Sequence, residues 1–169
     1  MEVSMPEYFI PAIEKVIDHR SLESKCVLWV LYADQIPPHI GISSKGFYFS
    51  LKANGKDSFV SVSSIIEVIE RKKIISLCFE LKYELEIDEL NSVFVNYKTT
   101  IPHITTCLNP IKEVLSLETP EKLTDLLDAL YDQDNIERTY GLNINTEFQG
   151  IKDYNVADIH ARLNNLKHG

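Results

Sequence analysis

The pattern of apolar and polar residues divides the chain into short segments of two kinds. The first kind is rich in β-branched and aromatic residues and is bounded by turn residues, which predicts strands. Ser44-Lys45-Gly46 joins two of these segments into a predicted hairpin, and Asn54-Gly55 marks a second tight turn. The predicted strands are residues 26–33, 39–43, 47–53, 59–62 and 74–83.

In the second kind of segment, apolar residues recur every three or four positions, as in amphipathic helices. Ser63 or Ser64 is expected to cap one of these helices, and Thr119-Pro120-Glu121 is a start signal for another. Pro102 excludes a continuous helix across the linker before Cys107. The predicted helices are residues 6–19, 63–71, 87–97, 110–117 led by Cys107, 123–130 and 156–166.

A run of predicted strands is followed by a run of predicted helices without an internal repeat, which predicts a mixed α+β fold with one antiparallel sheet flanked by helices. A chain of 169 residues matches the size of a single domain. We expect one domain over residues 1–169, with a core at about 26–131. Residues 132–169 are more polar and are expected to form a C-terminal extension, irregular up to its final helix.

The formal net charge of -8 disfavours sequence-independent nucleic-acid binding, which depends on lysine and arginine neutralising phosphates. Glu2 and Glu7 stand where a signal peptide would carry positive charge, and the longest apolar run, residues 26–33, is too short to span a bilayer. The three cysteines form neither a disulfide framework nor a zinc-site spacing. These features predict a cytoplasmic protein with no membrane span and no nucleic-acid partner.

Two residues far apart in the sequence suggest a chemical site. His39 opens the first strand of the predicted hairpin, and Cys107 stands at the start of an amphipathic helix. A thiol at a helix start and a neighbouring imidazole are the two parts of a cysteine nucleophile site. Cys26 and Cys78 lie inside apolar strands and are interpreted as core residues. Pro110 favours a position for Cys107 immediately before the helix.

The order of these motifs resembles that of circularly permuted papain-like thiol enzymes, the group of permuted NlpC-like peptidases and lecithin retinol acyltransferase-like proteins. His39-Ile40-Gly41-Ile42 comes first and the helix led by Cys107 comes later, as in the permuted branch. Cys107-Leu108-Asn109-Pro110, followed by Thr119-Pro120-Glu121, is similar to the cysteine helix and the Thr-Pro helix of some members. The resemblance covers about residues 27–130.

The resemblance implies a papain-like, circularly permuted fold and a thiol hydrolase or acyltransferase acting on an amide, thioester or ester bond. Cys107 would be the nucleophile and His39 its base. The third polar residue of the family lies on the strand after the histidine, where Ser50 is the best match. A serine hydroxyl can accept the imidazole N–H but carries no charge to stabilise an imidazolium. The expected partner is a peptide, amide or acyl substrate, with no cofactor and no metal.

Two alternatives remain open from the sequence. His103, four residues before Cys107, could pair with the thiol to bind a metal or could replace His39 as the base, although no third or fourth metal ligand is evident. The chain could also be a non-catalytic binding or antagonist protein on the same scaffold, of cellular or viral origin. In that case an exposed Tyr48 and the acidic C-terminal third are expected to contact a protein partner.

Overall fold

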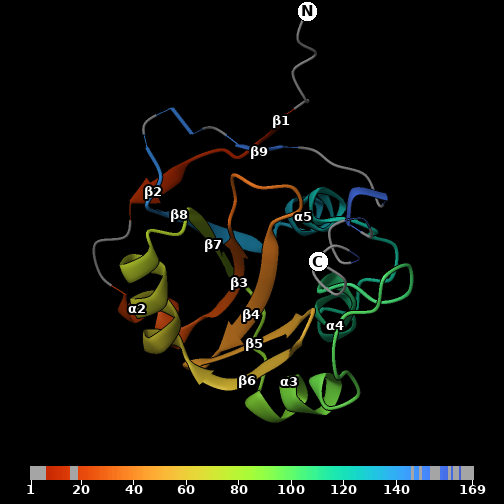
Figure 1. Cartoon of the computed structure of the whole chain (residues 1–169). Helices are drawn as coiled ribbons and strands as arrows, with labels where there is room; N and C mark the ends of the chain where they lie inside the picture. Colours follow the sequence, from red (N-terminus) through yellow and green to blue (C-terminus); the bar gives the residue numbers. More distant parts are fainter. Residues whose placement is uncertain are drawn as a thin grey trace, which may run out of the picture.

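The computed structural model describes residues 7–15, 19–145, 147–148, 150–152, 157–159, 161 and 164. It has a mixed α+β fold in which helices flank a large, mostly antiparallel sheet, as the sequence predicts (Figure 1). The strands are β1 (Glu7–Phe9), β2 (Ile13–Lys15), β3 (Cys26–Leu31), β4 (His39–Ser44), β5 (Phe47–Lys52), β6 (Gly55–Ser61), β7 (Ser76–Leu81), β8 (Ile136–Leu142) and β9 (Gly150–Lys152). The helices are α1 (Arg20–Ser24), α2 (Val62–Lys72), α3 (Ile87–Phe94), α4 (Leu108–Val114) and α5 (Leu123–Asp132).

The main sheet has the strand order β2-β8-β7-β3-β4-β5-β6. All of its neighbouring strands are antiparallel except β2 and β8, which run parallel. Every residue of β3 is buried, which confirms the prediction of a buried strand at the centre of the sheet. β1 and β9 form a separate two-stranded antiparallel sheet.

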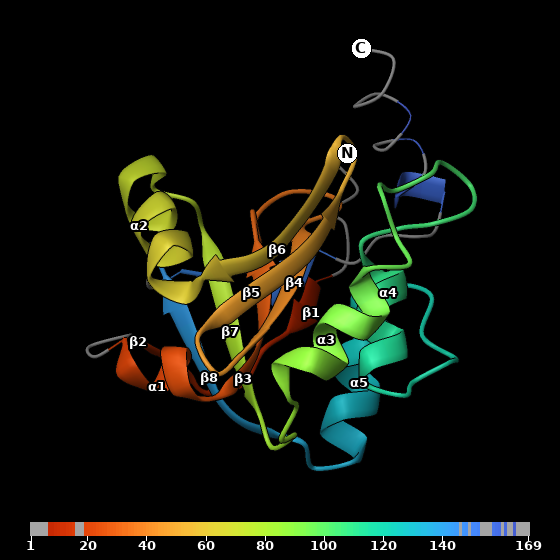
Figure 2. The ribbon, with the colours of Figure 1, turned by 90° about the horizontal axis from the view of Figure 1, so that it is seen from below.

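Helices cover both faces of the main sheet. α1 and α2 lie on one face, and α3, α4 and α5 lie on the other (Figures 1 and 2). Because successive strand residues point to opposite faces, the sheet contributes to two separate cores. The core on the α2 side contains Trp29, Tyr48, Ile69 and Cys78, and the core on the α5 side contains Leu28, Ile40, Phe49 and Leu126.

The β4–β5 hairpin confirms the prediction made from the sequence. Its two-residue connection is Lys45-Gly46, with φ of 49° and 88°. Positive φ at both central residues is the requirement of a type I′ turn, whose twist matches that of the paired strands. Glycine adopts this conformation without a steric penalty, so the position of Gly46 specifies the hairpin locally.

The predicted first helix, residues 6–19, is wrong over its described part. Residues 7–9 and 13–15 are strands β1 and β2. Pro11 lies between them, lacks a backbone N–H and interferes with a helix at this point. Pairing with β9 and β8, late in the sequence, satisfies the backbone groups of these two strands instead.

Two predicted helix starts are also wrong. The N-cap of α2 is Ser61, whose hydroxyl accepts a hydrogen bond from the backbone N–H of Ser64 at 3.2 Å. Strand β6 therefore runs directly into the helix, and Ser63 and Ser64 lie in its first turn. α5 begins at Leu123 with Lys122 at its N-cap, so Thr119-Pro120-Glu121 precedes the helix without capping it.

The segment expected to be irregular after residue 132 contains β8, which lies between β7 and β2 inside the main sheet. The predicted extension therefore contributes a strand to the core sheet. Its sequence includes Glu137 and Arg138, both exposed, so no continuous apolar run marks it. Pairing with β7 supplies the stabilisation that its composition lacks. Of the predicted C-terminal helix, residues 157–159, 161 and 164 are helical, and the others lie outside the described residues.

Within the described part of the chain, no helix combines the length and the apolar character needed to cross a membrane.

Candidate functional site

The candidate site lies where strands β4 and β5 separate. Their register runs from Ser44 opposite Phe47 to Ile42 opposite Phe49 and is not continued beyond that pair. β4 extends further to His39 while pairing with β3 only. On the other side of the gap, the backbone N–H of Thr100 donates to the carbonyl of Lys52 at 2.9 Å, which attaches the loop before α4 to the end of β5.

A pocket of about 510 Å³ opens at this position, within the range typical of small-molecule sites. Its wall is mainly apolar and comes from both strands and from the starts of α4 and α5. Its apolar lining includes Ile40, Leu51, Leu108 and Leu123, and its polar lining includes His39, Lys52, Lys56, Thr100, Thr106, Cys107 and Lys122. An apolar pocket with a few converging polar groups is the usual form of a binding or catalytic site.

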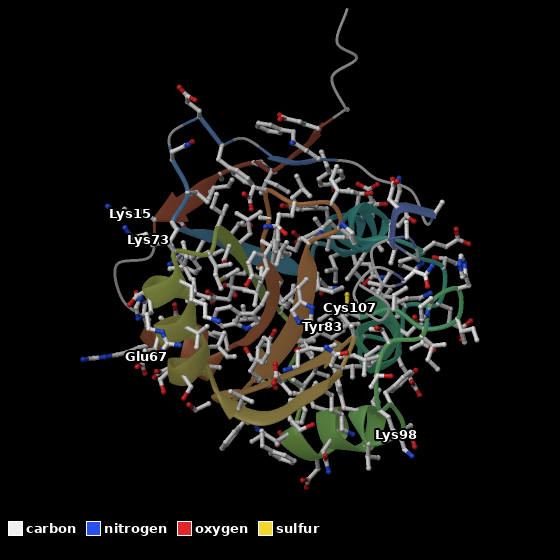
Figure 3. The ribbon with its side chains drawn as sticks, viewed as in Figure 1. Lys15, Glu67, Lys73, Tyr83, Lys98 and Cys107 are labelled. Carbon is white, nitrogen blue, oxygen red and sulfur yellow. The ribbon has the colours of Figure 1, made fainter. Side chains whose placement is uncertain are left out.

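Cys107 is the N-cap residue of α4 and lies immediately before the helix, as Pro110 predicts. Its side chain is partly buried against the core on the α5 side and points from α4 toward β4 (Figure 3). The first turn is held by Thr106, whose hydroxyl accepts from the N–H of Leu108 at 3.2 Å. Burial raises the pKa of the Cys107 thiol, while backbone hydrogen bonds of Ile40 and of Cys107 itself act in the opposite direction. The thiol is therefore protonated at neutral pH.

His39 is the first residue of β4 and also lines the pocket. Burial lowers the pKa of its imidazole to about 4, with Asp57 raising it and Lys52 lowering it further. Its Nε2 atom is buried and has no hydrogen-bond partner among the described residues. The ring is therefore neutral at neutral pH, and its Nε2 atom forms no hydrogen bond with any described residue.

The structure thus brings Cys107 and His39 to one pocket, but from different faces of the sheet. His39 pairs with Leu31, whose side chain belongs to the core on the α2 side, whereas Cys107 packs on the α5 side. Both groups are neutral, and no ion pair joins them among the described residues.

Ser50 is not among the residues that line the pocket, although the next two residues of β5, Leu51 and Lys52, are. Its hydroxyl donates to Oδ2 of Asp57 at 3.2 Å, and Lys52 Nζ contacts Oδ1 of the same carboxylate at 3.1 Å. Asp57 is on β6, directly opposite Ser50 in the strand register. The charge that Ser50 lacks is therefore supplied by Asp57, which raises the pKa of His39 against the dominant effect of burial.

Three polar residues near the pocket were not identified from the sequence: Lys56, Asp57 and Thr100. Lys56 and Asp57 belong to a segment that looks like a turn, whereas the actual turn is Ala53-Asn54 and β6 begins at Gly55. Thr100 lies in a linker without periodicity. No local signal marks these residues, because their position depends on the pairing of β5 with β6 and with the loop.

The structure does not support the alternatives that involve His103 or an exposed Tyr48. His103 is exposed, and unlike His39 it is not among the residues that line the pocket. Among the described residues, no group of three or more potential metal ligands comes together. The expectation of an exposed Tyr48 is wrong, because its ring is buried beneath β4 with 1% of its surface exposed.

Comparisons of the chain with protein-family profiles, with curated proteins and with solved structures found no match. The resemblance to permuted papain-like enzymes therefore remains a prediction from the order of motifs.

Proposed function

We propose that the protein is a cysteine-dependent hydrolase or acyltransferase with a permuted papain-like arrangement, in which Cys107 is the nucleophile and His39 the base. The observation that carries this proposal is that these two residues, distant in sequence, line one apolar pocket. The Nε2 atom of His39 is buried there without a partner. A neutral imidazole that can accept a proton is what a general base requires.

The protonation states favour a mechanism in which the proton moves during the attack, because no thiolate exists beforehand. Cys107 Sγ attacks the carbonyl carbon of an amide, thioester or ester while its proton passes to His39. His39 returns this proton to the leaving nitrogen, sulfur or oxygen, and the acyl group remains on Sγ as a thioester. Water or a second acceptor then attacks the thioester and gives a proton to His39, and this proton returns to Sγ as the C–S bond breaks.

The backbone N–H groups near the sulfur support the same assignment. Hydrogen bonds from Ile40 and from the Cys107 backbone lower the thiol pKa against the effect of burial. Such donors favour negative charge on the sulfur as it forms. Asp57, joined to Ser50, favours the protonated imidazole because its carboxylate raises the pKa of His39.

A second candidate is a binding protein that uses the same pocket without catalysis. It is favoured by the resting state of the two groups, since burial raises the pKa of Cys107 and lowers that of His39. These directions are opposite to those of a preformed thiolate–imidazolium pair. The two candidates differ in whether His39 accelerates a reaction of Cys107.

Acylation by p-nitrophenyl acetate separates the candidates, with the acetyl adduct followed by intact-protein mass spectrometry. Cys107→Ala should abolish the acetyl thioester, because Cys26 and Cys78 are buried in the cores. His39→Ala should slow it by about a hundredfold or more, as expected for loss of a general base. Ser50→Ala should cost about tenfold or less, the order of one hydrogen bond.

His103→Ala is the matched control, because it removes an exposed imidazole four residues before Cys107. Its acylation rate should equal that of the unchanged protein, and all variants should keep their melting temperatures within a few degrees. If His39→Ala and His103→Ala react at the same rate, His39 is not a base and the pocket belongs to a binding protein.

A further inference from the structure

The charge of the pocket differs from that of the whole chain. Lys52, Lys56 and Lys122 line it, Lys52 being paired with Asp57, and none of the described residues in its lining is Asp or Glu. The chain as a whole carries a formal net charge of -8. A cleft lined by one sign of charge between low-dielectric walls attracts ligands of the opposite sign.

Lys56 lies on the same face of the sheet as Cys107. Its register partner on β5 is Leu51, whose side chain lines the pocket next to Ile40. The Lys56 ammonium donates to the backbone carbonyl of Phe94, at the end of α3, over 2.9 Å. This bond uses one of three donors and holds the side chain in place. No carboxylate of the described residues forms an ion pair with it, so its positive charge is not compensated by a neighbouring acid.

Thr100 adds a hydroxyl group without a partner. The residue is 1% exposed and lines the pocket, and its Oγ1 atom has no hydrogen-bond partner among the described residues. Its backbone is fixed by the bond to Lys52 on β5. A buried hydroxyl without a partner costs stability that a ligand can restore by bonding to it.

We propose that the pocket selects substrates with an anionic group, a carboxylate or a phosphate, bound by the Lys56 ammonium and the Thr100 hydroxyl beside the carbonyl that Cys107 attacks. The position of the reacting carbonyl in this inference rests on the proposed function of Cys107. Binding of the anionic group by Lys56 and Thr100 does not require catalysis. Lys56 lies on β6 and Thr100 lies in the loop before α4. Lys56 is hydrogen-bonded to the backbone of Phe94, and the backbone of Thr100 is hydrogen-bonded to that of Lys52. The anionic group would occupy the end of the pocket formed by these two segments, and the apolar wall would contact the remainder of the substrate.

The first experiment compares alkylation of Cys107 by iodoacetate and by iodoacetamide, reagents that differ mainly in charge. The rate with iodoacetate divided by the rate with iodoacetamide should be higher for Cys107 than for free cysteine. This ratio should fall about fivefold or more in Lys56→Gln and in 1 M salt. Lys56→Arg should keep the ratio, since it restores the charge. Lys73→Gln removes an exposed lysine beside α2, far from Cys107 (Figure 3), and should leave the ratio unchanged.

The same experiment separates this inference from the proposed function. His39→Ala should slow both reagents equally if His39 activates the thiol, and Lys56→Gln should change only the ratio. A ratio equal to that of free cysteine, and equal in Lys56→Gln and the unchanged protein, would overturn the anion site even if His39 proves to be a base.

Binding to Cys107→Ala tests the anion site without any reaction of the thiol. Benzoate, phenyl phosphate and benzamide share an aromatic ring and differ in charge, and their dissociation constants can be measured by titration NMR. The anions should bind about tenfold more tightly than benzamide, and the stronger of the two identifies carboxylate or phosphate as the preferred group. Thr100→Val and Lys56→Gln should each reduce that preference. Equal binding of all three compounds would contradict the inference.

Discussion

At the scale of the residue, His39 shows how burial and charge compete. Its ring is removed from water, which disfavours the protonated form, and Asp57 compensates for this only in part. The Ser50 hydroxyl donates to Asp57, and its strand β5 lies between β4, which carries His39, and β6, which carries Asp57. The result is a neutral base, and its neutrality also links protein stability to pH.

The folded-state pKa of His39, about 4, lies below the ordinary value of 6.5, so the unfolded chain binds more protons between these pH values. The free energy of unfolding should therefore be highest above pH 6.5 and should decrease as the pH falls toward 4, by up to about 3 kcal/mol from this residue. Urea unfolding of the unchanged protein and of His39→Gln at several pH values measures the effect. His39→Gln should lose this part of the pH dependence and His103→Gln should keep it; equal pH profiles of the unchanged protein and His39→Gln would contradict the assignment.

At the scale of the element, β4 has two functions along its length. Near the turn it pairs with β5, and at its first residues it leaves β5 and opens the pocket. Gly41 lies between these two parts, where a side chain would collide with the ring of Tyr48. The close approach of that ring to the β4 backbone therefore depends on glycine, and the ring supports the strand directly beside His39.

Gly41→Ala should destabilise the protein by about 1–3 kcal/mol, the usual range for forcing an extra methyl group into a packed core. The cause can be checked with Tyr48→Leu, which removes the ring from this position. In a double-mutant cycle measured by denaturant unfolding, Gly41→Ala should cost distinctly less in the Tyr48→Leu background. Additive losses would show that the Tyr48 ring does not restrict residue 41.

At the scale of the whole molecule, the two cores share one sheet. β3, β5 and β7 each send side chains into both of them. Trp29, the single tryptophan of the chain, is fully buried in the core on the α2 side and donates to the hydroxyl of Ser43 at 2.7 Å. Because the strands are common to both cores, we expect the two sides to unfold together.

Leu126→Ala tests this cooperativity, because Leu126 is fully buried in the other core, on the α5 side. The substitution should cost about 2–5 kcal/mol. Trp29 fluorescence and far-UV circular dichroism should report the same lowered midpoint in denaturant. Ile69→Ala, in the core of Trp29, is the matched control and should shift both signals in the same way. A fluorescence midpoint that stays unchanged in Leu126→Ala would show that the two sides unfold independently.

The sequence by itself determined the features that depend on neighbouring residues. The apolar run of β3, the glycine turn between β4 and β5 and the periodicity of α3 are local signals, and each is found where it was predicted. The position of Cys107 immediately before α4 follows from Pro110. Burial of Cys26 and Cys78 was also predicted, because apolar neighbours surround both.

Only the tertiary structure decided the features that depend on distant segments. β1, β2 and β8 are strands because partners elsewhere in the chain satisfy their backbone groups, which local propensity does not reveal. The pocket exists because β4 and β5 separate and a later loop bonds to the end of β5. Lys56, Asp57 and Thr100 gain their importance from that arrangement alone. Burial, which sets the protonation of His39 and Cys107, is a property of the packed molecule and has no counterpart in the order of residues.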